Sequence, residues 1–266
     1  MIQKQVPIVF NHHLAGATHV LGFDCTEIAH AAAPGTFVMM REVRPRGYLL
    51  DRPFSIGNVN GNTIDIYYDT VGKATEAFAE LGKGDALDVF GPLGHGFTLD
   101  TWAKVNLLVA GGIGIAPFPY LAIQLAKHRP QARSVVLAGF RSAPLVVLEH
   151  HFGEIGVEFK VATDDGSRGY NGVVTGLLEQ ELDAHASKHE QVAVYACGPE
   201  PMLKRVAEVA VARDAFCELS LEQRMACGVG ACLVCACNTR RKDGGTEYKM
   251  VCKDGPVFNA RDVVFE

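Results

Sequence analysis

The sequence lacks three features that would assign it to a large class of proteins: a surplus of basic residues, a long apolar run and a secretion signal. Its 266 residues carry 25 Lys and Arg against 30 Asp and Glu, a formal net charge of −5. We therefore expect no nucleic-acid partner, because counterion release requires clustered basic residues. No apolar run approaches the roughly 20 residues of a membrane-spanning helix. The stretch Met1–Phe10 lacks the basic, apolar and small-residue order of a secretion signal, so we expect a cytoplasmic protein with reduced thiols and no membrane contact.

Internal repeats, low-complexity tracts and a Ser/His/Asp or Cys/His catalytic triad are also missing. The ten His residues are scattered, and the pairs His12-His13 and His150-His151 suit surface positions better than ligand positions. We therefore assign no catalytic side chain. The length suffices for one large domain or for two to three smaller ones, and the pattern of the sequence changes near residues 100 and 217.

Residues 1–100 predict an antiparallel β-barrel. Short runs rich in Val, Ile, Phe and Tyr alternate with turn signals such as Pro34-Gly35 and Gly91-Pro92. Many closely spaced short strands are typical of a small barrel, which one helix over Thr75–Leu81 interrupts before Gly82. The expected strands are Val6–Phe10, Thr18–Asp24, Gly35–Met40, Thr63–Tyr68 and Asp85–Phe90.

Residues 101–217 predict a doubly wound α/β domain with a parallel sheet. The continuous apolar run Val105–Ala110 is typical of a strand that is buried on both faces. Strands and helices then alternate, which indicates βαβ units. The further expected strands are Val135–Gly139, Glu158–Thr163 and Val192–Ala196, and the expected helices are Ile115–Lys127, Val173–Glu181 and Pro201–Ala212.

Residues 218–266 form a Cys- and Gly-rich segment with weak periodicity, too short for much core of its own. It contains five of the eight cysteines, and in a reducing compartment such a cluster indicates metal rather than disulfides. Four of them follow the spacing C-x4-C-x2-C-x16-C, and plant-type two-iron ferredoxins use C-x4-C-x2-C with a distant fourth Cys. We predict a plant-type [2Fe–2S] cluster whose ligands are Cys227, Cys232, Cys235 and Cys252.

The loop between the first two of these cysteines supports that prediction. Gly228 and Gly230 permit positive φ angles, so the loop can wrap one iron and direct backbone N–H groups at the sulfurs. A structural zinc is the alternative, although zinc sites more often show two C-x2-C pairs. The fifth thiol, Cys237, either replaces a ligand or packs beside the cluster, and we expect the second.

Two further turns each follow a predicted strand and open a predicted helix, as dinucleotide-binding loops do. A Gly-rich turn of this kind lets the backbone approach a pyrophosphate, with the helix N-terminus facing the anion. The first turn lacks the third glycine of the dinucleotide fingerprint, and a tight turn without a ligand is the alternative there. Cys197 taken alone would be a buried apolar filler. Strand ends on one edge of a doubly wound sheet line one crevice, so we expect both turns to hold one dinucleotide. The predicted contacts are Gly112 and Gly114 in the first turn, and Cys197, Gly198 and Pro199 in the second.

An acidic turn, Asp164-Asp165-Gly166, follows another strand of the same predicted sheet edge. Two carboxylates would repel a 2′-phosphate, so Asp164 is a candidate contact and NADH is favoured over NADPH. The alternative is an acidic turn without a ligand.

A second group of anion-binding features lies in the barrel portion. Arg52 precedes Pro53, Phe54 and Ser55, and a guanidinium offers a planar fork for phosphate oxygens. Downstream, Tyr67, Tyr68 and Asp69 lead to Gly72, Ala74 and Thr75 at a predicted helix start, which is a second candidate anion site.

With these motifs in this order, the chain resembles the ferredoxin-reductase superfamily over all three stretches. Arg52–Ser55 resembles its flavin motif, and the two turns at Gly111–Pro117 and Cys197–Met202 resemble its nicotinamide-nucleotide motifs. The segments Leu221–Cys232 and Val251–Phe258 are very similar to the electron-transfer subunit family of the NAD-dependent, class 1B dihydroorotate dehydrogenases.

This resemblance implies cofactors, a partner and site residues. Members carry FAD and a [2Fe–2S] cluster, and associate, two copies of each subunit, with an FMN-containing catalytic subunit that oxidises dihydroorotate in pyrimidine synthesis. Electrons then leave to NAD+. By position, FAD would contact Arg52, Pro53, Phe54, Ser55, Tyr67, Tyr68, Asp69, Gly72, Ala74 and Thr75. Two positions depart from the family, which often has a basic residue at Asp69 and Gly at Ala74.

We therefore expect an NADH-linked electron-transfer subunit. A flavin accepts both hydride and single electrons, so FAD has to lie between the nicotinamide and the cluster. Two rivals stay open: the same carriers serving another redox partner, and a zinc-stabilised nucleotide sensor without enzymatic activity.

Overall fold

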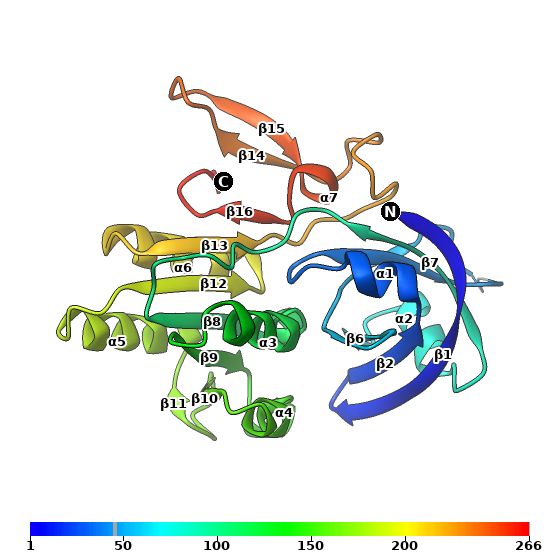
Figure 1. The fold of residues 1–266 in the computed structure, drawn as a ribbon, viewed down its shortest axis with the longest axis horizontal. Coiled ribbons are helices and arrows are strands. Elements are labelled where there is room, and N and C mark those ends of the chain that lie inside the picture. Colours follow the sequence, from blue (N-terminus) through cyan, green and yellow to red (C-terminus); the bar gives the residue numbers. More distant parts are fainter. Residues whose placement is uncertain (45–46, 266) are drawn as a thin grey trace.

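The computed structural model describes residues 1–44 and 47–265. Its first part is an antiparallel sheet of seven strands in the order β4-β3-β7-β1-β2-β6-β5, which curls into a half-barrel (Figure 1). The predicted antiparallel flavin barrel is confirmed in this form. The strands are β1 (Ile2–Ala15), β2 (Thr18–Asp24), β3 (Phe37–Glu42), β4 (Arg52–Ser55), β5 (Asn58–Asn60), β6 (Thr63–Asp69) and β7 (Ala86–Leu93), and the helices are α1 (Thr26–Ala31) and α2 (Lys73–Ala79).

Alternation along the strands builds the half-barrel core. In β6, Ile64, Ile66 and Tyr68 join one buried cluster with Leu87 and Val89 of β7, as expected when every second side chain points inward. The helix α2 adds Phe78 to the same cluster.

The second part is a sheet in the order β11-β10-β9-β8-β12-β13-β16. Its first six strands run parallel and β16 runs antiparallel to β13, so the doubly wound sheet is confirmed. The strands are β8 (Val105–Gly111), β9 (Arg133–Phe140), β10 (Glu158–Thr163), β11 (Tyr170–Asn171), β12 (Val192–Cys197), β13 (Phe216–Ser220) and β16 (Val257–Asn259). The helices are α3 (Phe118–His128), α4 (Glu149–Glu154), α5 (Val174–Ala186) and α6 (Glu200–Ala212), with 3₁₀ turns η1 (Gly112–Ile115) and η2 (Ala143–Leu145).

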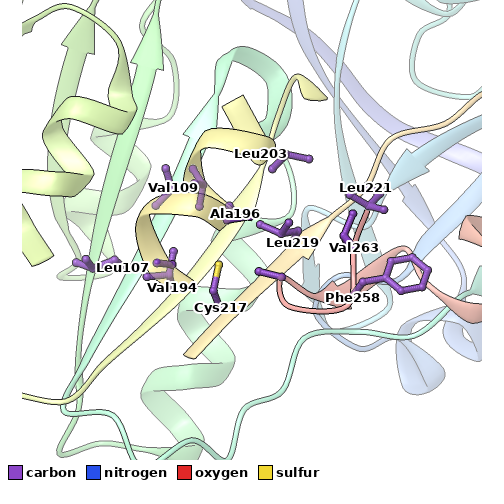
Figure 2. Packing of buried hydrophobic residues seen from close by; sticks show 14 of the residues in the cluster. Leu107, Val109, Val194, Ala196, Leu203, Cys217, Leu219, Leu221, Phe258 and Val263 are labelled. Carbon is purple, nitrogen blue, oxygen red and sulfur yellow. The ribbon is translucent and has the colours of Figure 1, made fainter. Parts of the chain in front are cut away.

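The sequence of β8 is apolar without interruption because both faces of this strand are buried. Leu107 and Val109 pack into a cluster with α5 and α6, as Figure 2 shows for the strands and α6. Leu108 and Ala110 pack into a different cluster with α3 and α4. Because helices cover both faces, neither face of β8 meets solvent.

The third part has no separate core. Its hairpin β14 (Ala236–Arg240) and β15 (Thr246–Met250), followed by α7 (Val251–Asp254), lies over the other two parts (Figure 1). Phe258 and Val263 continue the cluster of the parallel sheet (Figure 2), and Met39 of the half-barrel belongs to that cluster as well. Strand β13 crosses the predicted limit at residue 217 and β16 extends the sheet beyond it, so the three-part division stays a prediction.

Among the described residues, no helix combines the length and the apolar character that crossing a membrane requires.

Candidate cofactor-binding sites

The four cysteines of the predicted cluster come together in two pairs. The backbone N–H of Cys232 donates to Sγ of Cys227 over 3.4 Å, and the N–H of Cys252 donates to Sγ of Cys235 over 3.4 Å. The N–H of Gly230 donates to Sγ of Cys252 over 3.1 Å and so links the pairs. Cys235 and Cys252 are seventeen residues apart in the sequence. The segment before β14 and the helix α7 therefore meet at one site.

The loop conformation is the one that its glycines predict. Gly228 and Gly230 have φ angles of +70° and +79°, which other residues adopt only at a cost. This conformation directs the N–H groups of Val229 and Gly230 towards sulfur atoms. Leu233 also has a positive φ of 61°, a strained position that keeps the chain close between the second and third cysteines.

These hydrogen bonds favour thiolate at Cys227. Burial acts to raise its pKa, but backbone N–H groups of Val229, Cys232 and Ala231, together with the Cys232 side chain, outweigh burial and lower the pKa to about 6. At Cys252 burial dominates, with Cys235 adding to it, and raises the pKa to about 12. A metal has to displace that proton, since thiolate is the form that binds metal.

In the described part of the chain, no three His, Cys, Asp or Glu side chains are grouped to hold a single ion. The fifth thiol, Cys237, lies in β14 opposite Lys249, and burial raises its pKa to about 11. Together with Glu222 and Tyr248 it lines a cavity of about 330 Å³ between the hairpin and α6.

The two nucleotide turns meet at the point where the strand order of the parallel sheet reverses. β8 and β12 are neighbours, and their ends carry η1 and the Cys197–Pro199 turn. A Cβ added at Gly114 would collide with the Cys197 carbonyl group, and one at Gly198 would lie 3.0 Å from the backbone nitrogen of Gly111. The glycines therefore let the two turns touch at the topological switch point, the place where doubly wound sheets bind nucleotides.

Gly112 differs from Gly114 in what it faces. Its φ is +54° and a Cβ there would meet nothing within 4 Å, so the backbone in front of this residue is open to a ligand. Burial raises the pKa of the Cys197 thiol to about 12, so this side chain is neutral at pH 7.

The acidic turn after β10 lies beside the end of β9. The N–H of Asp164 donates to the Phe140 carbonyl over 3.0 Å. Asp165 accepts hydrogen bonds from the side chain and the backbone of Ser167, which lower its pKa. The hydroxyl of Ser167 in turn accepts the N–H of Ala143 over 2.8 Å. Both acids are exposed, and Asp165 holds the turn together through Ser167.

Changing Asp164 to Ser together with Asp165 to Arg is expected to raise the ratio of NADPH to NADH activity by about tenfold, because a repulsive charge is replaced by a phosphate-binding one. Steady-state rates with both nucleotides measure the ratio. Two single variants serve as controls. Asp165→Ser shows the effect of losing the hydrogen bonds that hold the turn, and Asp243→Ser shows the effect of removing one charge from the distant β14–β15 turn. An unchanged ratio in the double variant would remove the role assigned to Asp164.

The flavin-motif residues lie on β4, an edge strand beside β3. The Arg52 guanidinium donates to the Leu50 carbonyl over 2.7 Å and lies 5.6 Å from the centre of the Tyr48 ring. The Phe54 ring packs on Tyr68 and Phe78 at 5.9 and 5.7 Å. Both side chains are half-buried, with Arg52 against Leu50 and Tyr48 and Phe54 against the core of the half-barrel.

The remaining predicted flavin residues lie on β6 and at the start of α2. Asp69 accepts the hydroxyl of Thr18 over 2.6 Å, and Tyr68 donates to Oδ1 of Asn11 over 3.2 Å. Burial raises the pKa of Tyr68 to about 12 and also raises that of Tyr67. The side-chain bond of Asp69 thus directs its carboxylate to the neighbouring strand β2.

Thr75 caps the helix α2. Its Oγ1 accepts the N–H groups of Val71 and Gly72 at 2.9 and 3.2 Å and donates to the Gly72 carbonyl over 3.0 Å. Ala74 is buried in the same first turn. The Thr75 hydroxyl stabilises the helix start, and its contact with FAD stays a prediction.

Asp65 is a half-buried acid on β6 that the sequence pattern does not single out. It lies on β6 opposite Asn58, whose Nδ2 donates to Asp65 Oδ2 over 3.4 Å, while Oδ1 of Asn58 is buried without a partner among the described atoms. Burial raises the pKa of Asp65 from 3.8 to about 6. Thr63, Asp65 and Tyr67 alternate with apolar residues along β6. This alternation indicates that the second face of the strand is partly polar, and it could have identified Asp65.

Asp65→Asn is expected to stabilise the folded chain at pH 8 by about 3 kcal/mol. The raised pKa means that the fold favours the neutral acid, so its stabilisation is complete below pH 4 and is lost as the pH rises through 6. The advantage of the variant should therefore disappear on acidification. Thermal unfolding at pH 4 and 8 measures it, with exposed Asp100→Asn as control. Equal advantages at both pH values would contradict the assignment.

Comparisons with known proteins agree with this arrangement. The family model of the iron–sulfur cluster binding domain of dihydroorotate dehydrogenase B matches residues 222–264, and that of the oxidoreductase NAD-binding domain matches residues 108–208. The structure of an NADH-dependent reduced ferredoxin-NADP oxidoreductase superposes with a TM-score of 0.82 at 26% identity, over 97% of this chain and 89% of that one. A ferredoxin NADP+ reductase from Neisseria gonorrhoeae shares the fold at a TM-score of 0.66 and 15% identity, over 80% and 92% of the two chains.

Curated relatives cover nearly the whole chain. The dihydroorotate dehydrogenase B (NAD(+)) electron transfer subunit of Bacillus caldolyticus is 39% identical over 266 residues, 98% of each chain. The subunit of the same name from Fusobacterium nucleatum is 37% identical over 260 residues, 96% of each chain. With the half-barrel, the parallel sheet and the cysteine site in place, the chain belongs to the family of the electron transfer subunits of dihydroorotate dehydrogenase B (NAD(+)).

Proposed function

We propose that this subunit passes electrons between an FMN-containing dihydroorotate dehydrogenase catalytic subunit and NAD+, through a [2Fe–2S] cluster and FAD, in pyrimidine biosynthesis. The observation that carries the proposal is the shared core: one buried cluster joins Met39 of the half-barrel, Val109 of the nucleotide sheet and Cys252 of the cysteine site. Because the three cofactor segments pack on one core, the distances between the cofactors would be short and fixed, as electron transfer requires.

The pairing of the thiols supports two iron atoms. Each iron of a plant-type cluster takes two thiolates, and the structure offers the pairs Cys227 with Cys232 and Cys235 with Cys252. A structural zinc would draw four thiolates around one ion. Backbone N–H groups that already point at sulfur also offset the negative charge of such a cluster.

Open backbone at the half-barrel and at the switch point of the parallel sheet supports two nucleotide sites. Arg52 is half-buried beside β3, and a Cβ at Gly72, at the start of α2, would meet nothing within 4 Å. On the parallel sheet, Gly112 presents open backbone at the switch point. These features support Arg52–Ser55 and the first turn of α2 as the FAD site, and the turns at Gly112–Gly114 and Cys197–Pro199 as the NAD site.

Bound FAD would accept or give up two electrons as hydride and would also pass them on one at a time. The chain itself binds and orients the three cofactors. The β8 and β12 turns hold the nicotinamide nucleotide, the half-barrel holds the flavin, and the Cys227 loop holds the cluster with its N–H groups directed at the sulfurs. We also propose a cytoplasmic assembly with two copies of each subunit, which the family resemblance supports.

Anaerobic purification tests the cofactors. Flavin and iron–sulfur absorption that NADH bleaches is expected, with two irons and two labile sulfides per FAD. A colourless protein after anaerobic reconstitution would overturn the proposal, and zinc without iron or sulfide would favour the nucleotide sensor.

Co-purification from the native source tests the partner. The complex is expected to oxidise dihydroorotate with NAD+, and its mass reports the stoichiometry. A complex that is reduced by NADH but inactive with dihydroorotate would assign the same carriers to another redox partner.

A further inference from the structure

Tyr120 belongs to the nucleotide sheet by sequence and to the half-barrel by packing. It lies in the first turn of α3, its side chain is 7% exposed, and its ring joins the core of the half-barrel. Every other buried member of that cluster in the described chain lies between Val6 and Val89. The ring therefore crosses from one part of the molecule into the other.

Two hydrogen bonds fasten Tyr120 to separate segments of the half-barrel. Its hydroxyl donates to the Ala32 carbonyl, just after α1, over 3.1 Å. Its backbone N–H donates to the Gly57 carbonyl, between β4 and β5, over 2.8 Å. An N–H in the first turn of a helix has no partner within the helix, so α3 obtains this one from the half-barrel.

Both attachment points adjoin a predicted cofactor loop. Gly57 follows Ser55 of the flavin motif by two residues, and Tyr120 follows Gly114 by six. A Cβ at Gly57 would lie 2.5 Å from the Tyr67 ring and 3.0 Å from the Ala116 carbonyl oxygen. The backbones of the two loop regions therefore touch, and Tyr120 secures that contact.

We propose that Tyr120 is a positioning residue that holds the nucleotide turn against the flavin strand at the separation that hydride transfer requires. This inference rests on the proposed function, in which a hydride carries two electrons from NADH to FAD and leaves NAD+. Reacting atoms have to approach within about 3–3.5 Å, and a displacement of about 1 Å can slow such a step about a hundredfold. A tyrosine that crosses the junction restricts such displacements.

Tyr120→Phe tests the inference because it removes only the hydroxyl bond to Ala32. Amide exchange in the first turn of α3, measured by hydrogen–deuterium exchange on the cofactor-loaded chain, is expected to accelerate about fivefold. In stopped flow, the maximal rate of flavin reduction by NADH should fall by about fivefold to tenfold, while the KM for NADH changes by less than about twofold. FAD content, iron content and reduction by dithionite should stay unchanged.

Tyr195→Phe is the matched control. It removes a comparable hydrogen bond of a buried tyrosine, which the Tyr195 hydroxyl donates to the Thr98 carbonyl over 2.8 Å. This bond lies away from the contact between Gly57 and α3. It should lower the melting temperature about as much as Tyr120→Phe without changing the rate of flavin reduction. A role of Tyr120 in stability alone would make the two variants alike in both measurements.

Tyr120→Leu extends the test by withdrawing the ring from the half-barrel core. Flavin reduction by NADH should slow by about a hundredfold in a variant that still binds FAD. Should this variant fail to fold, Tyr120→Phe decides. Wild-type rates and exchange in Tyr120→Phe would overturn the inference and leave the proposed function intact, whereas a wild-type chain that NADH does not reduce would overturn the proposed function.

Discussion

Cys232→Ser is expected to remove the iron–sulfur cluster while leaving FAD bound at about one per chain. Cys232 is exposed at the end of the Gly-rich loop, and its N–H bonds to Cys227. In the proposed [2Fe–2S] cluster, loss of this thiolate would leave one iron with a single protein ligand. The residues predicted to bind FAD lie on β4, on β6 and at the start of α2, outside this loop.

Iron, labile sulfide and FAD analyses check the prediction. Iron should fall to about one-tenth or less, and electron transfer to the partner should fall about a hundredfold or more. NADH-driven reduction of a dye that accepts electrons from flavin should persist. Cys237→Ser is the matched control, since this thiol lies in β14 outside the two pairs, and it should keep its iron. Loss of FAD in Cys232→Ser would contradict the separation of the two sites.

Gly114→Val is expected to abolish most NADH-dependent flavin reduction while the chain keeps FAD and its cluster. A Cβ at Gly114 meets the backbone of Cys197 and lies 2.7 Å from Cα of Gly198. Backbone atoms cannot rotate away, so the two nucleotide turns have to separate. Overpacking of this kind costs about 1–3 kcal/mol, and the crevice between the turns loses its shape.

Stopped-flow reduction by NADH should slow about a hundredfold, or the KM should rise by a similar factor. Dithionite reduction of the same flavin should be normal. Gly153→Ala is the matched control, because it adds the first carbon of a side chain in the same part of the molecule where a Cβ meets nothing within 4 Å. Unchanged reduction by NADH in Gly114→Val would show that the crevice between these turns is not the NAD site.

The grouping of the cysteines and the shape of their loop were predictable because this information is nearly local. Cys227, Cys232 and Cys235 lie within nine positions, and the positive φ angles of Gly228 and Gly230 follow from the absence of a side chain. The strand β8 was equally accessible, since an uninterrupted apolar run is what a strand covered on both faces requires.

Other elements were not predictable from local pattern. β13 contains Glu218, whose buried carboxylate accepts the N–H and the hydroxyl of Thr98 at 2.8 and 2.6 Å. Thr98 is 120 residues away in the sequence, so local pattern does not reveal this contact. Without it, a glutamate at this position is typical of a solvent-exposed loop. β16 is three residues long and exists because β13 offers an edge to pair with.

Individual flavin contacts show the same limit. The resemblance implies that Asp69 contacts FAD. In the structure its Oδ1 accepts the hydroxyl of Thr18 on the neighbouring strand, and the flavin contact stays a prediction. Thr75 is committed to capping α2. A motif specifies which residues lie near a cofactor, whereas the cross-strand and capping bonds of each side chain decide what it can still bind.

The sequence by itself predicted the antiparallel barrel, the parallel sheet and the clustered cysteines, because spacing, periodicity and turn chemistry act over a few residues. The family came from the resemblance of its motifs to known proteins. Only the tertiary structure decided how the thiols pair, why Gly114 lacks a side chain, and that Tyr120 joins the nucleotide sheet to the half-barrel. Each of these depends on atoms far apart in the chain that packing alone brings together.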